Sequence, residues 1–234
     1  MLFDVGMENN IEGRSCSWVL GHPGCFAYGK DSAAALAATA DAIRRYAAWI
    51  EAHGAKGWLE IDELEIRLLE TWDVYDINDN YDRVEQGYSV NAWFQHDWKP
   101  LTDQDVERGL KLLTWSRQDL LEAVHSLTPE GLNATYPGER WSISGILRHV
   151  GGAEWWYLHR LGLAFPRERV PDDPFDRLQT VRARLLEVLP QLSGSRLVMG
   201  VDGEFWSPRK LLRRAVWHER DHIWHILSLF QQRR

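Results

Sequence analysis

The stretch from Ser207 to His225 constrains the fold more than any other part of the chain, because it joins a helix start signal to two histidines with ligand spacing. Ser207 is of a residue type that caps helix N-termini, and Pro208 suits the first helical turn. His218 and His222 are four residues apart, so they share one face of the predicted helix at about 100° per residue. Two imidazoles on one face can hold a divalent metal when a third ligand comes from elsewhere. A metal site here therefore requires a second element that faces this helix.

The distribution of charge indicates two units within the 234 residues. Residues 1–99 carry 8 Lys/Arg and 17 Asp/Glu, a net charge of −9, whereas residues 100–234 carry 19 and 17, a net charge of +2. Together they give the net −7 of the chain. This acidic balance argues against a broad nucleic-acid-binding surface, so we do not expect a nucleic-acid partner.

Two further features bear on the cellular compartment. No apolar run approaches the roughly 20 residues of a membrane-spanning helix, and the N-terminus lacks a basic segment followed by an apolar one. We therefore expect a cytoplasmic protein without a membrane partner. Cys16 and Cys25 are the only cysteines. We interpret them as reduced thiols, with a disulfide across a hairpin as the alternative.

Residues 1–70 predict a small α+β unit. The stretch Met1–Gly29 has strand patterns broken by a turn at residues 22–24. Asp31 or Ser32 then caps an alanine-rich helix that runs from residue 33 to about residue 53 and ends at Gly54. Apolar and charged residues alternate in residues 61–69, which predicts a closing strand or a short helix.

This unit resembles the HicB antitoxin family in two segments. The first is Pro23–Ser32 (PGCFAYGKDS), which is similar to that family's Pro-Gly-Cys turn. The helix that follows matches at Ala35, Ala42, Ile43, Trp49 and Gly54. The resemblance implies a sheet packed on one long helix, and a protein partner for residues 1–70. No helix-turn-helix or ribbon-helix-helix pattern follows, so we interpret this part as a reused structural or dimerising module.

Residues 71–99 are acidic and aromatic, and they predict an irregular connector. Asp76, Asn78 and Asn80 match the first three positions of a calcium-binding loop. Tyr81 and Gly87 then stand where that loop needs Gly and Glu. We interpret the segment around residues 76–80 as a solvated turn.

Residues 100–234 predict an all-α four-helix bundle. Thr102 with Asp105 approximates a capping box, Ser142 is a second helix cap, and Asp173 precedes a first-turn proline. The four predicted long helices cover residues 102–126, 143–161, 174–189 and 208–225. A short helical turn near residue 129 and a loop over residues 193–206 connect them.

Two of these helices resemble the DinB/YfiT-like metalloprotein superfamily. The segment Trp141–Trp156 (WSISGILRHVGGAEWW) has a Trp-Ser helix start, a single histidine and a Glu-Trp-Trp run. The segment Trp217–Ile223 (WHERDHI) is similar to the family's His-Glu-x-x-His. The resemblance covers about residues 100–234 and implies that His149, His218 and His222 are the metal ligands. It also implies that bundles pair as homodimers, and that some members use a low-molecular-weight thiol as cosubstrate.

Three other residues lie near this ligand set. His225 shares the stripe of the final helix and stands where many members have Gln, so we interpret it as a hydrogen-bond partner of a ligand or an alternative ligand. Arg214, one turn before His218, could bind an anionic group of a substrate or form a salt bridge. Glu154 could be a general base or an acceptor for a ligand imidazole. It lies about 140° around its helix from His149, which favours a salt bridge.

The sequence thus predicts a metal-dependent enzyme that acts on a small molecule, either a thiol-dependent transferase or isomerase or a hydrolase. Three histidine ligands leave one coordination position open, as in catalytic zinc sites. Zinc or nickel suits imidazole donors, with iron or manganese as alternatives. A second possibility is a non-catalytic binding protein, in which residues 1–70 recognise a protein partner and the bundle is a scaffold or sensor. A bundle that has lost its metal and kept its fold is a third.

Overall fold

The computed structural model describes residues 1–231 and divides the chain into two compact units. Unit 1 comprises Met1–Lys99 and Val198–Lys210, and unit 2 comprises Pro100–Leu197 and the chain from Leu211 onward. The last three residues of the predicted 100–234 bundle lie outside the described residues. Within the described part, no helix is long and apolar enough to cross a membrane.

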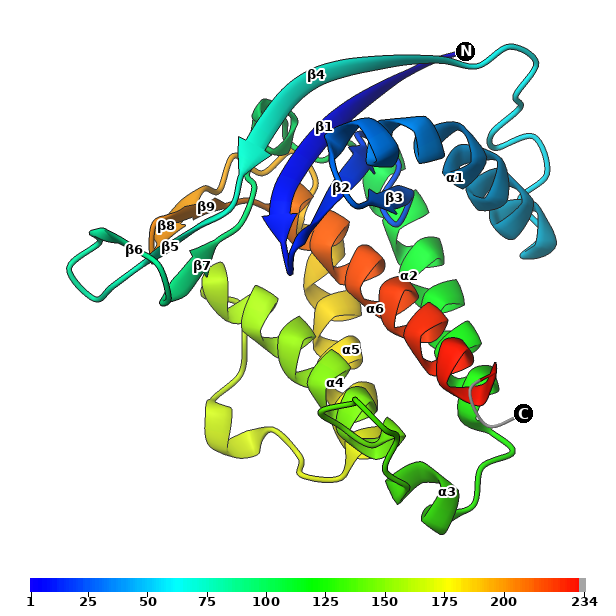
Figure 1. Ribbon diagram of the computed structural model, residues 1–234, viewed down its shortest axis with the longest axis vertical. Coiled ribbons are helices and arrows are strands. Elements are labelled where there is room, and N and C mark those ends of the chain that lie inside the picture. The colour runs from blue at the N-terminus through cyan, green and yellow to red at the C-terminus, as the bar shows by residue number, and fades with distance from the viewer. Residues whose placement is uncertain (232–234) are drawn as a thin grey trace. The chain divides into compact units, whose positions relative to one another are not determined.

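Unit 1 contains a four-stranded sheet with one long helix packed against it (Figure 1). The strand order is β3-β2-β1-β4, in which β1 pairs antiparallel with β2 and parallel with β4. These elements are β1 (Leu2–Ile11), β2 (Arg14–Val19), β3 (Phe26–Gly29), α1 (Ser32–Ala52) and β4 (Glu65–Asp73). The strands predicted before residue 30 are confirmed, and of the two alternatives for residues 61–69 the strand is right.

A local sequence signal explains the start of α1. Asp31 caps the helix, since its carboxylate accepts a hydrogen bond from the backbone N–H of Ala34 at 2.8 Å.

Cys16 and Cys25 are both buried and free, so no disulfide joins them. The interpretation of the cysteines as reduced thiols is therefore confirmed.

A second, three-stranded sheet occupies residues 75–90, where the prediction of an irregular segment is wrong. Its order is β6-β5-β7, and its strands are β5 (Tyr75–Ile77), β6 (Arg83–Val84) and β7 (Tyr88–Val90). Strands of two or three residues are too short to show an alternating pattern. The turn prediction is confirmed, because the side-chain oxygen of Asn78 accepts hydrogen bonds from the backbone N–H groups of Asn80 and Asp82. A 3₁₀ helix, η1 (Gln95–Trp98), ends this part of the chain.

The predicted loop over residues 193–206 contains a hairpin that belongs to unit 1. Its strands are β8 (Met199–Val201) and β9 (Glu204–Trp206). The carboxylate of Glu204 is buried and binds the ammonium of Lys210 at 2.8 Å and the backbone N–H of Asn91 at 2.9 Å. Burial opposes the charge of Glu204, but these partners outweigh it, so the pKa of Glu204 is lowered. The hydrogen bonds that Asn91 donates to Glu204 join the hairpin to the earlier part of unit 1, a contact that the sequence pattern did not indicate.

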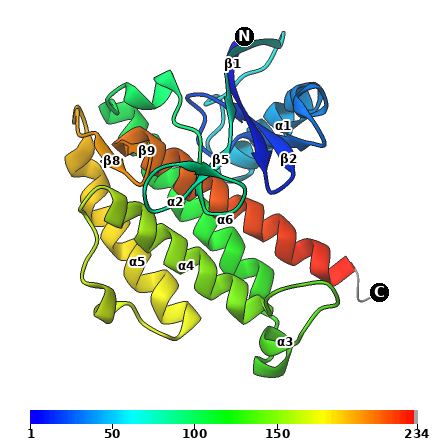
Figure 2. The ribbon, with the colours of Figure 1, turned by 60° about the vertical axis from the view of Figure 1, so that its left-hand side comes forward.

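Unit 2 is built from four long helices that lie side by side (Figures 1 and 2). They are α2 (Asp103–Val124), α4 (Ile143–Arg160), α5 (Pro174–Val188) and α6 (Pro208–Gln231), of which α6 begins in unit 1. The short elements α3 (Pro129–Asn133), η2 (Arg167–Arg169) and η3 (Leu189–Leu192) lie in the connections. The predicted caps are confirmed, since Thr102, Ser142 and Ser207 each accept a backbone N–H at the start of their helix.

All four long helices contribute apolar side chains to the core of unit 2. Its fully or nearly fully buried members include Leu120, Val124, Ile143, Ile146, Leu147, Val150, Leu178, Ile226 and Leu229. Gly151 lets α4 and α5 approach closely, because a Cβ there would lie 2.9 Å from Cγ of Arg177 and 3.3 Å from the backbone nitrogen of Leu178. Tight packing thus offsets the helix-propensity cost of about 1 kcal/mol for this glycine.

Candidate metal centre

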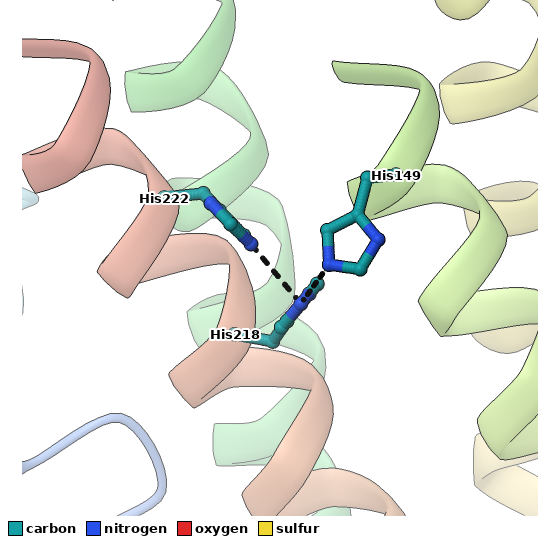
Figure 3. Close-up of side chains that lie close together, drawn as sticks. All are labelled: His149, His218 and His222. Atoms are coloured by element: carbon teal, nitrogen blue, oxygen red, sulfur yellow. Dashed lines mark hydrogen bonds between the residues drawn. The ribbon is translucent and has the colours of Figure 1, made fainter. Parts of the chain in front are cut away.

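Three histidine side chains converge in unit 2, one from α4 and two from α6 (Figure 3). Nε2 of His218 lies 3.1 Å from Nε2 of His149 and 3.2 Å from Nε2 of His222. The ligand atoms of the three residues all lie within 4.8 Å of one another. Among the described residues, they form the one group of His, Cys, Asp or Glu side chains with such spacing. The final helix and the helix that carries His149 therefore do face each other at this point.

Aromatic side chains surround the three imidazoles. The ring of Trp141 stacks on that of His149, with centroids 4.6 Å apart and an interplanar angle of 28°. Tyr157 meets His218 edge-on at 6.0 Å, and Trp217 is tilted against the same imidazole at 5.6 Å. His218 itself is 8% exposed. These contacts restrict the orientation of the rings and keep most water away from the central nitrogen atom.

Burial sets the protonation state of the two histidines on α6. It lowers the pKa of His218 well below its usual range, and positive charge on His222, His149 and Arg214 lowers it further. Burial likewise lowers the pKa of His222 to about 3, with smaller contributions from His149 and His225. Both imidazoles are therefore neutral near pH 7, which is the state that binds a metal ion.

We expect the metal-free protein to lose stability as the pH falls below about 6.5. An unfolded histidine takes up a proton near pH 6.5, whereas folded His222 does so only near pH 3. Between these values the unfolded state binds more protons, so the stability present above pH 6.5 declines on acidification. The slope is at most about 1.4 kcal/mol per pH unit for each such histidine. Urea unfolding in chelator at pH 7 and pH 5 measures it, and His222→Gln should show a smaller difference than the wild type. An equal difference in both proteins would contradict the prediction.

His225 lies outside the group of three. Its Nε2 is 2.9 Å from Oε2 of Glu139, and its ring centroid is 5.9 Å from that of His222. Both members of this pair are partly exposed, at 32% and 25% of their side-chain surface. Glu139 precedes α4 in a connecting segment, and no feature of the sequence pointed to it.

Arg214 lies beside the site, as its position one turn before His218 predicts. The residue is 6% exposed, and its guanidinium carbon lies 4.5 Å from the ring centroid of Trp217. Its charge is among the causes that lower the pKa of His218. A positive charge therefore stands within electrostatic reach of the three imidazoles.

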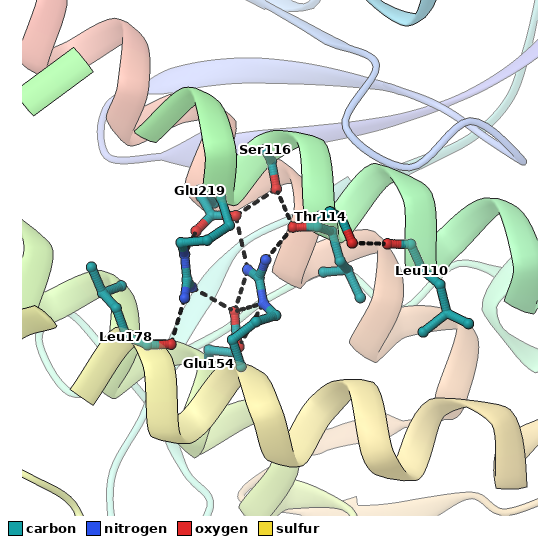
Figure 4. A network of polar contacts seen from close by, with 9 residues as sticks. Leu110, Thr114, Ser116, Glu154, Leu178 and Glu219 are labelled. Carbon is teal, nitrogen blue, oxygen red and sulfur yellow. Dashed lines mark hydrogen bonds and ion pairs between the residues drawn. The ribbon is translucent and has the colours of Figure 1, made fainter. Parts of the chain in front are cut away.

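Glu154 belongs to a buried ion-pair network to which each long helix contributes one charged residue (Figure 4). Its carboxylate lies 2.6 Å from Arg182 of α5 and 3.5 Å from Arg117 of α2. Glu219 of α6, which directly follows His218, lies 2.6 Å from Arg117 and 2.8 Å from Arg182. The interpretation of Glu154 as a salt-bridge residue is thus confirmed.

The other members of this network were not predicted, although one signal for them existed. Leu113, Leu120 and Leu121 have spacings that place them near one face of α2. In the structure Leu121 is 41% exposed, and Arg117 is buried on the inner face with Leu113 and Leu120. An arginine spaced four and three residues from two leucines shares their helix face, and a charge buried on that face needs a partner of opposite charge.

Comparison with known proteins agrees with the helical part of this description. Residues 112–226 match the family model described as the DinB superfamily, and this segment contains all three histidines. A similar solved structure is that of YfiT from Bacillus subtilis, described as a probable metal-dependent hydrolase with an unusual four-helix bundle topology. It has 20% sequence identity and a TM-score of 0.45, and the match covers 58% of this chain and 93% of that chain. No curated protein matches the chain. The HicB-like resemblance of residues 1–70 stays a prediction, and residues 112–226 are similar to the DinB superfamily.

Proposed function

We propose that the chain is a metal-dependent enzyme whose divalent cation is held by His149, His218 and His222. The observation that carries the proposal is the convergence of three Nε2 atoms around one buried point. The lowered pKa values of His218 and His222 support it, because neutral imidazole is the ligating form. The match of residues 112–226 to the DinB superfamily is independent support.

The donor set fits a shared cation better than it fits hydrogen bonds alone. Nε2 of His218 has close neighbours on two sides, at 3.1 and 3.2 Å. A ring nitrogen carries either one proton or one lone pair, so a proton satisfies only one of the two contacts well. Imidazole nitrogens in a tetrahedral zinc site stand about 2.0–2.1 Å from the metal, and hence about 3.3 Å from one another. Zinc or nickel is therefore our choice of cation.

When bound by these three residues, such a cation would supply Lewis-acid chemistry and would lower the pKa of a water or thiol that it binds. The chain's own residues restrict what reacts there. The positive charge of Arg214 beside His218 favours a substrate with an anionic group. Glu139 holds His225 with its ring 5.9 Å from that of His222, so this imidazole lies next to the group of three. We therefore propose hydrolysis, or thiol-dependent transfer or isomerisation, of a small anionic substrate.

Metal content tests the proposal directly. We expect about one zinc or nickel ion per chain in untagged protein purified without chelator, and almost none in His149→Ala, because two ligands on one helix bind weakly without the third. Inductively coupled plasma mass spectrometry measures this ratio. His125→Ala is the matched control, since His125 is exposed and hydrogen-bonded within its own turn. A wild-type protein that takes up no metal, even with added zinc or nickel, would contradict the proposal.

A further inference from the structure

Unit 1 carries a cluster of aromatic rings that reaches the surface, formed by Trp72, Tyr75, Trp93, Trp98 and Phe205 and called here the aromatic surface. Trp93 is central, with ring centroids 5.1 Å from Trp72, 5.6 Å from Trp98 and 4.9 Å from Phe205. Trp98 and Phe205 lie 5.2 Å apart and are 43% and 41% exposed. Contiguous exposed apolar side chains commonly mark an interaction site.

Carboxylates that lack a cationic partner lie beside these rings. Glu70 is two residues before Trp72 on β4, so both side chains point to the same face of the sheet. Its Oε2 accepts a hydrogen bond from the backbone N–H of Gln95 at 2.8 Å, in the segment that also carries Trp93 and Trp98. Within the described residues, Glu70 forms no ion pair. A neutral donor therefore fixes the position of this carboxylate and leaves its negative charge uncompensated.

A second carboxylate repeats the arrangement next to Tyr75. Asp76 accepts hydrogen bonds from the hydroxyl of Ser89 at 2.7 Å and from the backbone N–H of Gly87 at 2.9 Å. In the part of the chain that the structure describes, it too forms no ion pair. Residues 70–99 contain seven acidic and two basic residues, a net charge of −5. The segment that carries four of the five rings is therefore strongly acidic.

One end of the cluster already binds a cation within the chain. The guanidinium carbon of Arg83 lies 3.9 Å from the ring centroid of Tyr75. The face of an aromatic ring attracts cations because of its quadrupole, and a nearby carboxylate adds to the attraction. The exposed rings of Trp98 and Phe205 offer the same chemistry to a cation from outside.

We propose that the aromatic surface binds a basic segment of a protein partner, whose Arg or Lys side chains stack on Trp98 and Phe205 while Glu70 supplies the counter-charge. The uncompensated carboxylates and the net charge of −5 favour a cationic ligand and disfavour a nucleic acid. Two neighbouring exposed rings suit an extended segment that presents several cations. This proposal does not depend on the metal site, because all of its residues lie in unit 1.

A pair of matched peptides tests it on the full chain. The probe is a fluorescent nine-residue peptide with three arginines, and its control replaces them with citrulline, which is neutral and of similar shape. We expect the arginine peptide to bind at least about tenfold more tightly in fluorescence anisotropy, with an affinity that falls as salt rises. Trp98→Ala/Phe205→Ala should weaken this binding about fivefold or more, and Glu70→Gln, which keeps an acceptor for Gln95, about threefold.

Two variants control for general effects of apolar area and charge. Leu121→Ala removes an equally exposed apolar side chain from unit 2, and Glu51→Gln removes an acidic charge elsewhere in unit 1; neither should change the dissociation constant. Equal binding of both peptides, or none up to about 1 mM protein, would overturn the proposal. Self-association that Trp98→Ala/Phe205→Ala abolishes would also overturn it, by assigning the surface to a second copy of the chain.

Discussion

Replacing Glu219 with alanine is expected to lower the free energy of unfolding of the helical unit by about 3 to 5 kcal/mol, because two buried arginines lose a counter-charge. Its carboxylate pairs with Arg117 and Arg182 and accepts a hydrogen bond from the hydroxyl of Ser116. Both guanidinium groups also donate to backbone carbonyl groups, so neither can turn away to solvent without breaking further bonds. Burial raises the pKa of Glu219, but these partners lower it by more, so the net pKa is lowered. The carboxylate is therefore stabilised in its ionised form.

Two variants separate charge from packing in this experiment. Glu219→Gln keeps an acceptor of nearly the same shape, so its loss should be smaller than that of Glu219→Ala. Glu107→Ala removes an exposed partner of Lys111 and should cost less than about 1 kcal/mol. Urea unfolding in the presence of chelator, followed by circular dichroism at a helical wavelength, gives the three values without a contribution from metal. A Glu219→Ala protein within about 1 kcal/mol of the wild type would contradict the network's role.

The helical scaffold could be predicted from the sequence because its signals are local. Thr102 with Asp105, Ser142, Asp173 and Ser207 mark helix starts that depend only on residues within one turn, and each of the four long helices begins at one of them. The hairpin at residues 199–206 could not be predicted this way. Its strands have three residues each, and what fixes it is the ion pair of Glu204 with Lys210 and the bonds of Glu204 to Asn91, more than 100 positions away.

The candidate site also combines local signals, which could be predicted, with contacts between distant positions, which could not. The spacing of His218 and His222 predicts a shared helix face, whereas only the resemblance to a family points to His149, because sequence spacing does not say which helix lies opposite. Glu139 and the partners of Glu154 could not be predicted, because each of these pairs joins positions 28 to 86 residues apart. Buried polar groups are satisfied wherever the fold brings a partner, so their pairing follows from the packing of the helices.

Saturating zinc or nickel is expected to stabilise the wild-type protein and to leave His218→Ala unchanged. A ligand that binds only the folded state at one hundred times its dissociation constant adds about 2.7 kcal/mol to the free energy of unfolding. His218 should be indispensable, because its Nε2 is the atom close to both other nitrogens. Urea unfolding with chelator and with excess metal measures the difference for each protein.

The change in unfolding free energy on adding metal is the informative quantity, because removing one of three crowded imidazoles changes the stability of the metal-free protein by itself. His225→Ala is the matched control, because its imidazole pairs with Glu139 rather than joining the group of three. It should keep most of the stabilisation by metal. If His218→Ala keeps it and His225→Ala loses it, the cation is bound by a different set of ligands, in which His225 takes the place of His218 on the same face of α6.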